Sequence, residues 1–354
     1  MRRAQRGFSL PEIMVALTIS LVLILGVGAI FMGSKQSYRT NGALADIQEN
    51  GRFAMEFLRR DLRAAGYSPC GNTATATNVL KNAGTTPSLD FFDTPLMGYE
   101  SVNSASDLPS YAGVRDPVDG TDAVMALFGD QSSGFVVTDH NPTSAEFKIA
   151  KASDVDKSES DRAKHDFEAE DVLMACDLSH SAIFQVSNAN QENLTIVHNT
   201  GGSISPGNCT KGLGSPLQCT TNGTPYTFGD DSRIVRMNSY LYYVAENADG
   251  VSALYRAGLG GSNEELVPGV QDMQIEYGLD TDDDGNVDSY EDADAVGDWN
   301  EAVGLRISLL VYSLDDNVLN DTQTLEFNGS NVSPPNRRLG HVFTTTIALR
   351  NRLP

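Results

Sequence analysis

The chain is short of positive charge. Its 354 residues include 25 lysines and arginines against 47 aspartates and glutamates, which gives a formal net charge of −22. Three of the cations, Arg2, Arg3 and Arg6, fall within the first seven residues, so the remainder carries −25 (22 basic against 47 acidic residues). Because nucleic acid repels such an acidic surface, we expect no nucleic-acid partner.

The sequence also lacks the motifs of the common enzyme classes. It contains no His-Glu-x-x-His, no Gly-x-Ser-x-Gly, no phosphate loop and no Gly-x-Gly-x-x-Gly. A single histidine without such a context is most often an ordinary surface or core residue. We therefore expect that the protein is not an enzyme. The histidines are scattered along the chain as His140, His165, His180, His198 and His341.

Cysteine is scarce, with only Cys70, Cys176, Cys209 and Cys219. No Cys-x-x-Cys or cysteine–histidine pattern occurs, so the spacing gives no metal signature. Four cysteines fit an oxidising compartment, where disulfides persist. Cys209 with Cys219 would close a short loop and leave Cys70 with Cys176. The alternative of Cys176 with Cys209 would tie two apparent strands, and the sequence leaves both pairings open.

One long apolar stretch is present near the N-terminus. Residues 13–32 carry no charge, and twenty such residues are enough for a helix to cross a bilayer. The basic residues before the stretch predict a cytoplasmic N-terminus. Glu12 stands at the start of this segment. A carboxylate within a membrane span is costly, by about 3 kcal/mol at the bilayer centre. Such a cost indicates that Glu12 has a function.

The junction at residues 6–12, Arg-Gly-Phe-Ser-Leu-Pro-Glu, resembles the class III signal of type IV prepilins. The resemblance implies that a prepilin peptidase cleaves between Gly7 and Phe8 and methylates Phe8. It also implies that Glu12, at the fifth mature position, pairs with the N-terminal amine of a neighbouring subunit. A secretory signal peptide would need a cleavage site of small residues after the apolar stretch. Residues 33–35 match such a site poorly. An uncleaved anchor would leave Glu12 unexplained.

The apolar stretch runs on into a segment of amphipathic helical spacing. Gly66 and Pro69 predict its end, so we expect a leader at 1–7 and one helix over 8–66, transmembrane over about 13–32. Gly26 and Gly28 weaken the helix by about 1 kcal/mol each relative to alanine. They favour either close packing against other helices or local unwinding when subunits enter a fibre. The apolar positions of the second half are Leu44, Ile47, Ala54, Leu58 and Leu62, with Phe53 and Phe57 beside them.

Residues 67–354 read as a β-rich domain. We predict an α+β, type IV pilin-like fold in which the long N-terminal helix packs on a large domain with an antiparallel sheet. Residues 70–160 read as short strands between long loops, and residues 154–171 as a solvated loop or short helix. A hairpin is predicted around Asp249-Gly250. The strand-like segments are 123–128, 135–138, 172–175, 182–186, 194–197, 240–245, 251–255, 273–279, 305–311 and 343–349.

Residues 280–291, Asp-Thr-Asp-Asp-Asp-Gly-Asn-Val-Asp-Ser-Tyr-Glu, match the spacing of a twelve-residue calcium loop. Gly285 stands at the sixth position, where the chain must turn sharply. An alternating strand-like segment precedes the loop, so we interpret it as a structural clip rather than an EF-hand sensor. The alternative is an acidic solvated turn. The predicted calcium ligands are Asp280, Asp282, Asp284, Asn286 (through its backbone carbonyl), Asp288 and Glu291.

Three C-terminal stretches resemble the PilW family of minor pilins. They are residues 274–280 leading into the acidic loop, Trp299 ahead of residues 305–313, and the tail at residues 337–351. The resemblance implies a low-abundance subunit at or near the fibre tip, beside other minor pilins and the major pilin. There it would prime pilus assembly for twitching motility and cell adhesion, and contact a tip adhesin. The subunit would wait in the inner membrane as a single-pass protein, with its bulk periplasmic, before joining the fibre at the cell surface.

Two further hypotheses stay open at this stage. A minor pseudopilin of type II secretion shares the leader and can also hold calcium. A calcium-dependent adhesive module at the tip would bind a surface ligand, and an exposed aromatic or polar patch within residues 70–160 would favour it.

Overall fold

The computed structural model describes residues 9–71, 75–130, 134–230, 232–349 and 351. The predicted leader at 1–7 and the predicted cleavage and methylation site at Gly7 and Phe8 lie outside these residues. The chain divides into two units. The first comprises residues 1–49 and 312–341, and the second comprises residues 50–311 and 342–354.

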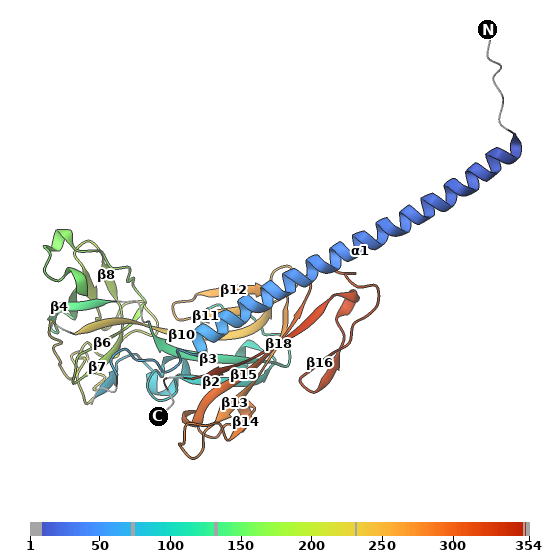
Figure 1. Ribbon diagram of the computed structural model, residues 1–354. Coiled ribbons are helices and arrows are strands. Elements are labelled where there is room, and N and C mark those ends of the chain that lie inside the picture. Colours follow the sequence, from blue (N-terminus) through green and yellow to red (C-terminus); the bar gives the residue numbers. More distant parts are fainter. Residues whose placement is uncertain (1–8, 72–74, 131–133, 231, 350, 352–354) are drawn as a thin grey trace, which may run out of the picture. The chain divides into compact units, whose positions relative to one another are not determined.

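Helix α1 (Leu10–Leu62) is the longest element, at 53 residues (Figure 1). It contains an 18-residue window of mean hydropathy 2.7, none of it buried, which is long and apolar enough to cross a membrane. In the second half of α1, the packed face includes Ile47, Leu58 and Leu62 as predicted. Leu44 and Phe53 are 37% and 53% exposed because they lie beside that face rather than on it.

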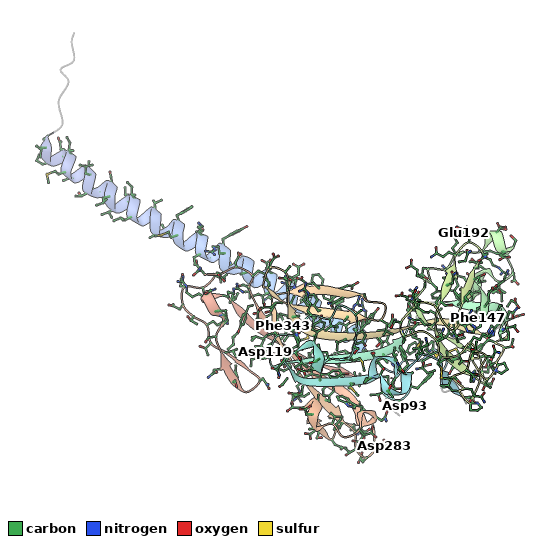
Figure 2. All side chains as sticks on the ribbon, turned by 180° about the vertical axis from the view of Figure 1, so that it is seen from behind. Asp93, Asp119, Phe147, Glu192, Asp283 and Phe343 are labelled. Carbon is green, nitrogen blue, oxygen red and sulfur yellow. A yellow bond between two sulfur atoms is a disulfide. The ribbon has the colours of Figure 1, made fainter. Side chains whose placement is uncertain are left out.

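The C-terminal part of α1 is fixed within the second unit. Gly51 packs against the ring of Phe343, labelled in Figure 2, so closely that a Cβ at position 51 would lie 2.3 Å from it. Asp61 is buried and accepts hydrogen bonds from the Tyr242 hydroxyl and from Arg256 Nη1, the latter at 3.3 Å. A side chain at position 51 would therefore force the ring of Phe343 to move, and the buried carboxylate of Asp61 ties the helix to Tyr242 and Arg256.

A twelve-stranded sheet forms most of the second unit. Its central strand is β10 (Arg233–Glu246), which pairs antiparallel with β3, β4, β6 and β11. Among its described pairings only β1 with β7 is parallel. The other strands are β1 (Ala76–Asn78), β2 (Leu96–Val102), β3 (Thr121–Gly129), β4 (Phe135–Asn141), β5 (Glu146–Lys151), β6 (Val172–Cys176), β7 (Ser181–Gln185), β8 (Asn188–Asn190), β9 (Thr195–Val197), β11 (Ser252–Gly258) and β12 (Asn263–Pro268).

A second sheet has the strand order β14-β13-β15-β18, with β13 (Val270–Leu279), β14 (Ser289–Glu291), β15 (Ala302–Tyr312) and β18 (Gly340–Ala348). In the first unit, β16 (Leu325–Phe327) and β17 (Ser330–Val332) form a separate hairpin. Short 3₁₀ turns complete the described structure at Ala83–Thr85, Pro87–Leu89, Ala105–Asp107, Ala152–Asp154, Glu159–Asp161, Ala293–Ala295, Trp299–Glu301 and Pro335–Arg337.

The observed architecture confirms the predicted α+β class with antiparallel sheets. The hairpin around Asp249-Gly250 forms between β10 and β11, with Glu246 opposite Ser252. Residues 70–160 hold more strand than predicted, since β3 alone has nine residues, all of them buried. Two cores result within the second unit. One includes Met125 and Tyr243, and the other gathers aromatic rings around Phe147.

Candidate functional site

The first candidate site is the start of helix α1, where Glu12 lies in the first turn. Its Oε2 accepts hydrogen bonds from the main-chain N–H of Ser9 at 2.8 Å and from the Ser9 hydroxyl at 2.7 Å. This resembles one half of a capping box, in which a glutamate side chain reaches back to the residue before the helix. The contacts orient the carboxylate toward the N-terminal end of the helix. Its role in assembly stays a prediction.

The second candidate site is the acidic loop between β13 and β14. The two strands pair antiparallel, with Tyr277 opposite Glu291 and Leu279 opposite Ser289, so the loop is the turn of a β-hairpin. Strands flank the loop on both sides, since β13 ends at Leu279, directly before Asp280, and β14 includes Glu291. The strand-flanked context predicted from the alternating residues 273–279 is therefore present.

Asp280 organises the loop from its buried end. Its Oδ2 accepts the N–H of Gly285 at 2.8 Å, and its Oδ1 accepts the N–H of Asp284 at 3.1 Å. Gly285 has φ +83°, a conformation that suits glycine, at the sixth position of the loop. Val287 packs back onto the sheet, since a Cβ on Gly278 would lie 3.0 Å from it. The loop is thus folded by its own carboxylate and by one apolar contact.

Three of the predicted ligands are brought together. Carboxylate oxygens of Asp280, Asp282 and Asp288 lie within 4.8 Å of one another, close enough to share a cation. The other two carboxylates are not in this group: Asp284 accepts the N–H of Asn286 at 2.8 Å, and Glu291 lies in β14. Three convergent carboxylates are hard oxygen donors, which is the chemistry that calcium prefers. These three residues would supply part of the six to eight oxygen ligands that a calcium ion takes.

The electrostatics of the loop reflect this crowding. The neighbouring charge of Asp284, followed by burial and the charge of Asp288, raises the pKa of Asp282. Hydrogen bonds from the hydroxyl and N–H of Thr281, at 2.6 and 2.8 Å, lower the pKa of Asp288. Like charges held this close repel, and a bound cation would relieve the repulsion.

The structure contains two disulfides. Cys70 bonds to Cys176 across 106 residues, and Cys209 bonds to Cys219 across 10. The first joins the chain just after α1 to the end of β6. Of the two pairings that the sequence left open, the structure holds the one that closes the short loop.

Two family models match the chain. Residues 2–28 match the prokaryotic N-terminal methylation motif, and residues 241–351 match the type IV pilus-assembly protein W family. The second match begins within β10 and includes the acidic loop, β15 and β18. Together these two matches support a PilW-like type IV minor pilin.

The two matches leave the middle of this pilin, residues 29–240, without a counterpart. No curated protein and no solved structure matches the chain. The methylation motif and the apolar helix together support membrane anchoring and a pilus-associated location. The two matches also suggest prepilin processing and interaction with other pilus components.

Four of the five histidines of the pilin lie buried beside one aromatic core, which sequence reasoning missed because they are far apart in the chain. His140 stacks on Phe147 with ring centroids 3.9 Å apart, and His198 lies 5.6 Å from His140. Neither ring nitrogen of His198 has a hydrogen-bond partner among the described residues. Burial lowers the pKa of His140 to about 4, against the opposing charge of Asp139. Burial and the charges of His140 and Lys211 lower the pKa of His198 to about 3.

These buried imidazoles predict loss of stability in acid. A folded-state pKa below the ordinary 6.5 means that the unfolded chain binds protons first, so the stability present above pH 6.5 is lost as pH falls toward 4. Each histidine adds a slope of about 1.4 kcal/mol per pH unit in that window. We expect His198→Phe to reduce the slope of unfolding free energy between pH 6.5 and 4.5 by about one such increment, measured by urea unfolding of the full-length protein in detergent. His341→Phe, at an exposed position, is the control, and an equal reduction there would contradict the assignment.

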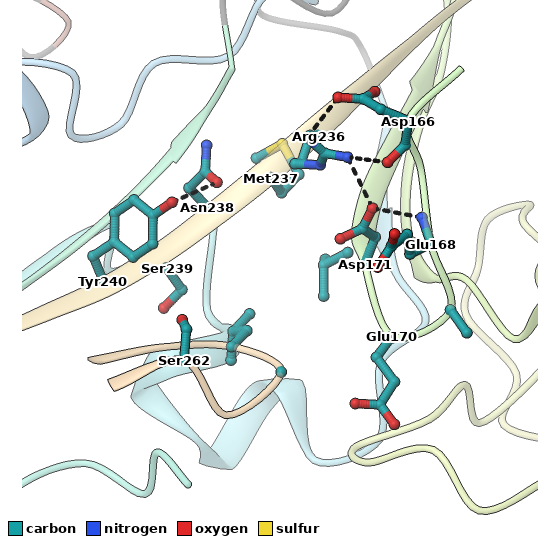
Figure 3. Close-up of a pocket in the computed structure, with 14 residues that line it drawn as sticks. Asp166, Glu168, Glu170, Asp171, Arg236, Met237, Asn238, Ser239, Tyr240 and Ser262 are labelled. Carbon is teal, nitrogen blue, oxygen red and sulfur yellow. Dashed lines mark hydrogen bonds and ion pairs between the residues drawn. The ribbon is translucent and has the colours of Figure 1, made fainter. Parts of the chain in front are cut away.

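A polar cavity of about 550 Å³ lies beside the first half of β10 (Figure 3). Arg236 projects from β10 toward the residues before β6 and pairs with Asp171 at 3.0 Å and with Asp166 at 3.6 Å. Glu168 and Glu170 also line this wall, while Ser262 lies on the wall across the cavity. The guanidinium of Arg236 is thus already paired with two carboxylates of its own chain, and we assign the cavity no function.

Proposed function

We propose that this pilin is incorporated at or near the tip of the type IV pilus and helps to prime fibre assembly. The observation that carries the proposal is Glu12 at the start of a bilayer-length apolar helix. A carboxylate in that position is costly in lipid, and pairing with the Phe8 amine of a neighbouring subunit offsets the desolvation of both charges. The PilW match at residues 241–351 supports the minor rather than the major role.

The proposed partners and location follow from the same features. Prepilin peptidase cleaves between Gly7 and Phe8 and methylates Phe8. The protein then waits in the inner membrane as a single-pass subunit, with a cytoplasmic N-terminus and its bulk in the periplasm, because the basic residues precede the span. On entering the fibre it contacts other minor pilins, the major pilin and a tip adhesin.

Deletion of the gene tests this function. We expect surface pili to be lost or sparse by electron microscopy, because without the primer new fibres rarely start, while type II secretion of a known exoprotein continues. Complementation with the wild-type gene is the control. Normal pili with failed secretion would instead place the protein among pseudopilins, and normal pili with normal secretion would leave an adhesive role.

We also propose that the acidic loop binds calcium as a structural clip. Support comes from the convergence of Asp280, Asp282 and Asp288 and from the positive φ of Gly285. Bound calcium would neutralise the repulsion between these carboxylates and hold the turn that joins β13 to β14. Sites of this kind outside the cytosol bind with dissociation constants of about 10⁻⁴ to 10⁻³ M, so occupancy would stabilise the fold by mass action.

A further inference from the structure

Strand β18 forms one end of the second sheet, and its hydrogen bonds show which of its residues face outward. Leu349 donates its N–H to the carbonyl of Val303 at 2.9 Å, and Ser313 donates its N–H to the carbonyl of Leu339 at 2.8 Å. Both contacts belong to one antiparallel register with β15. In such a ladder alternate residues bond to the same neighbour. The odd-numbered residues of β18 therefore bond to β15, and the even-numbered residues direct their N–H and C=O groups away from it.

The first outward-facing residue, Gly340, is already paired by a side chain. Its N–H donates to Gln323 Oε1 at 2.9 Å, and its carbonyl accepts from Gln323 Nε2 at 3.1 Å. The amide of Gln323 thus stands where the peptide group of a neighbouring strand would stand. Beyond it, the main chains of Thr344, Thr346 and Ala348 receive no strand on this side within the part of the chain that the structure describes. All three residues are exposed.

This edge is unprotected in comparison with other sheet edges of the protein. Sheet edges are usually protected from other chains by charges, proline, bulges or shortness. Strand β12 carries Glu264, Glu265 and Pro268, β2 has a register shift and Glu100, and β14 has only three residues. Strand β18 has nine residues with no charge and no proline, and it keeps a single register.

The edge is also rigidly held. On the inner face of β18, Phe343 packs against Gly51 of α1, which fixes the strand on the helix. On the other face, the hydroxyls of Thr344 and Ser308 are 3.0 Å apart and link β18 to β15. A preformed edge binds an extended segment at a lower entropic cost than a flexible one.

We infer that the outer edge of β18, from Val342 to Ala348, receives an extended strand from another pilus subunit. This inference rests on the proposed function, because only a fibre component brings a second subunit to this edge. The incoming segment is uncharged and β-branched, to match the exposed threonines of β18. A second copy of this chain is disfavoured because, without the leader, each carries a net charge of −25 (22 basic against 47 acidic residues) and the two would repel.

The test combines a cross-link with a backbone block. A photo-cross-linking amino acid at Ala348, in cells that make pili, should form an adduct that mass spectrometry assigns to a strand segment of another pilin. Thr346→Pro removes the outward N–H without removing a bond to β15. We expect it to reduce both the adduct and surface piliation about tenfold, since a few backbone hydrogen bonds are lost. Thr346→Val keeps the N–H and should match the wild type.

Each outcome bears on the proposal. Unchanged piliation and adduct in Thr346→Pro, an adduct with a second copy, or no adduct would overturn it. Thr346→Lys, which places a charge on the edge without constraining the backbone, should reproduce the loss even where the proline variant melts at a lower temperature. If deletion of the gene abolishes pili while Thr346→Pro and Thr346→Lys assemble them normally, strand addition fails and the assembly role stands.

Discussion

Replacing Glu12 with alanine is expected to leave the leader processed but to keep the subunit out of assembled fibres. The leader is read at Gly7 and Phe8, so cleavage and methylation do not need the carboxylate. Incorporation does, because without Glu12 the Phe8 amine of the neighbouring subunit has no partner in lipid. An uncompensated charge there costs about 3 kcal/mol, so we expect the variant in sheared fibres at about one hundredth of the wild-type level. Immunoblots of sheared fibres and membranes measure both steps.

Two substitutions separate the charge from the local geometry. Glu12→Gln keeps the length of the side chain and its bond to the N–H of Ser9 but removes the charge, so it should fail like alanine. Ser9→Ala removes only the hydroxyl contact of 2.7 Å and should incorporate nearly normally. Wild-type amounts of Glu12→Ala in sheared fibres would disprove the assembly role of this carboxylate.

Addition of calcium is expected to raise the melting temperature of the wild-type protein and to have no effect on the double variant Asp282→Asn/Asp288→Asn. At a hundredfold excess over the dissociation constant, binding adds about 2.7 kcal/mol, which corresponds to a rise of about 5 °C or more for a domain of this size. In chelator the double variant should melt no lower than the wild type, because it has lost the repulsion between carboxylates. Differential scanning calorimetry of the full-length protein in detergent provides the measurement.

The matched control is Asp283→Asn in the same loop. Asp283, labelled in Figure 2, has φ +60° and lies outside the group of convergent carboxylates. The substitution Asp283→Asn removes one charge from the same turn, and asparagine tolerates the left-handed conformation. The calcium response should persist in this variant. If calcium still raised the melting temperature of the double variant, the ion would bind elsewhere. If Asp283→Asn lost the response equally, the effect would come from the net charge of the loop and not from these ligands.

The fold was predictable where local patterns are strong. Alternation at residues 273–279 and 305–311 predicted β13 and β15 because one face of each strand is buried. Asp249-Gly250 predicted the hairpin because it supplies the turn. Strands β2, β5 and β12 were missed, since Gly98 and Glu100 interrupt β2 and β12 begins Asn-Glu-Glu, compositions that strands disfavour. Each of them pairs with a strand next to it along the chain, β2 with β3, β5 with β4 and β12 with β11.

The candidate site was predictable as a motif but not as a geometry. The spacing of Asp280 to Glu291 predicted six ligands but not which of them converge. Here strand β14 follows, so Glu291 continues the ladder opposite Tyr277, and the convergent group is Asp280, Asp282 and Asp288. The burial of His140 and His198 could not be read from sequence, because β4 and the end of β9 meet only through β5.

The bond between Cys70 and Cys176 determines how this subunit would carry mechanical load. Tension applied through α1 reaches Cys70 a few residues after the helix ends, and the covalent bond passes it directly to β6. Strand β6 is paired with β10, so the force spreads into the central sheet. Residues 71–175 form a loop in parallel with that bond. Tension between Cys70 and Cys176 is therefore carried by the covalent bond and does not have to pass along the main chain of this loop.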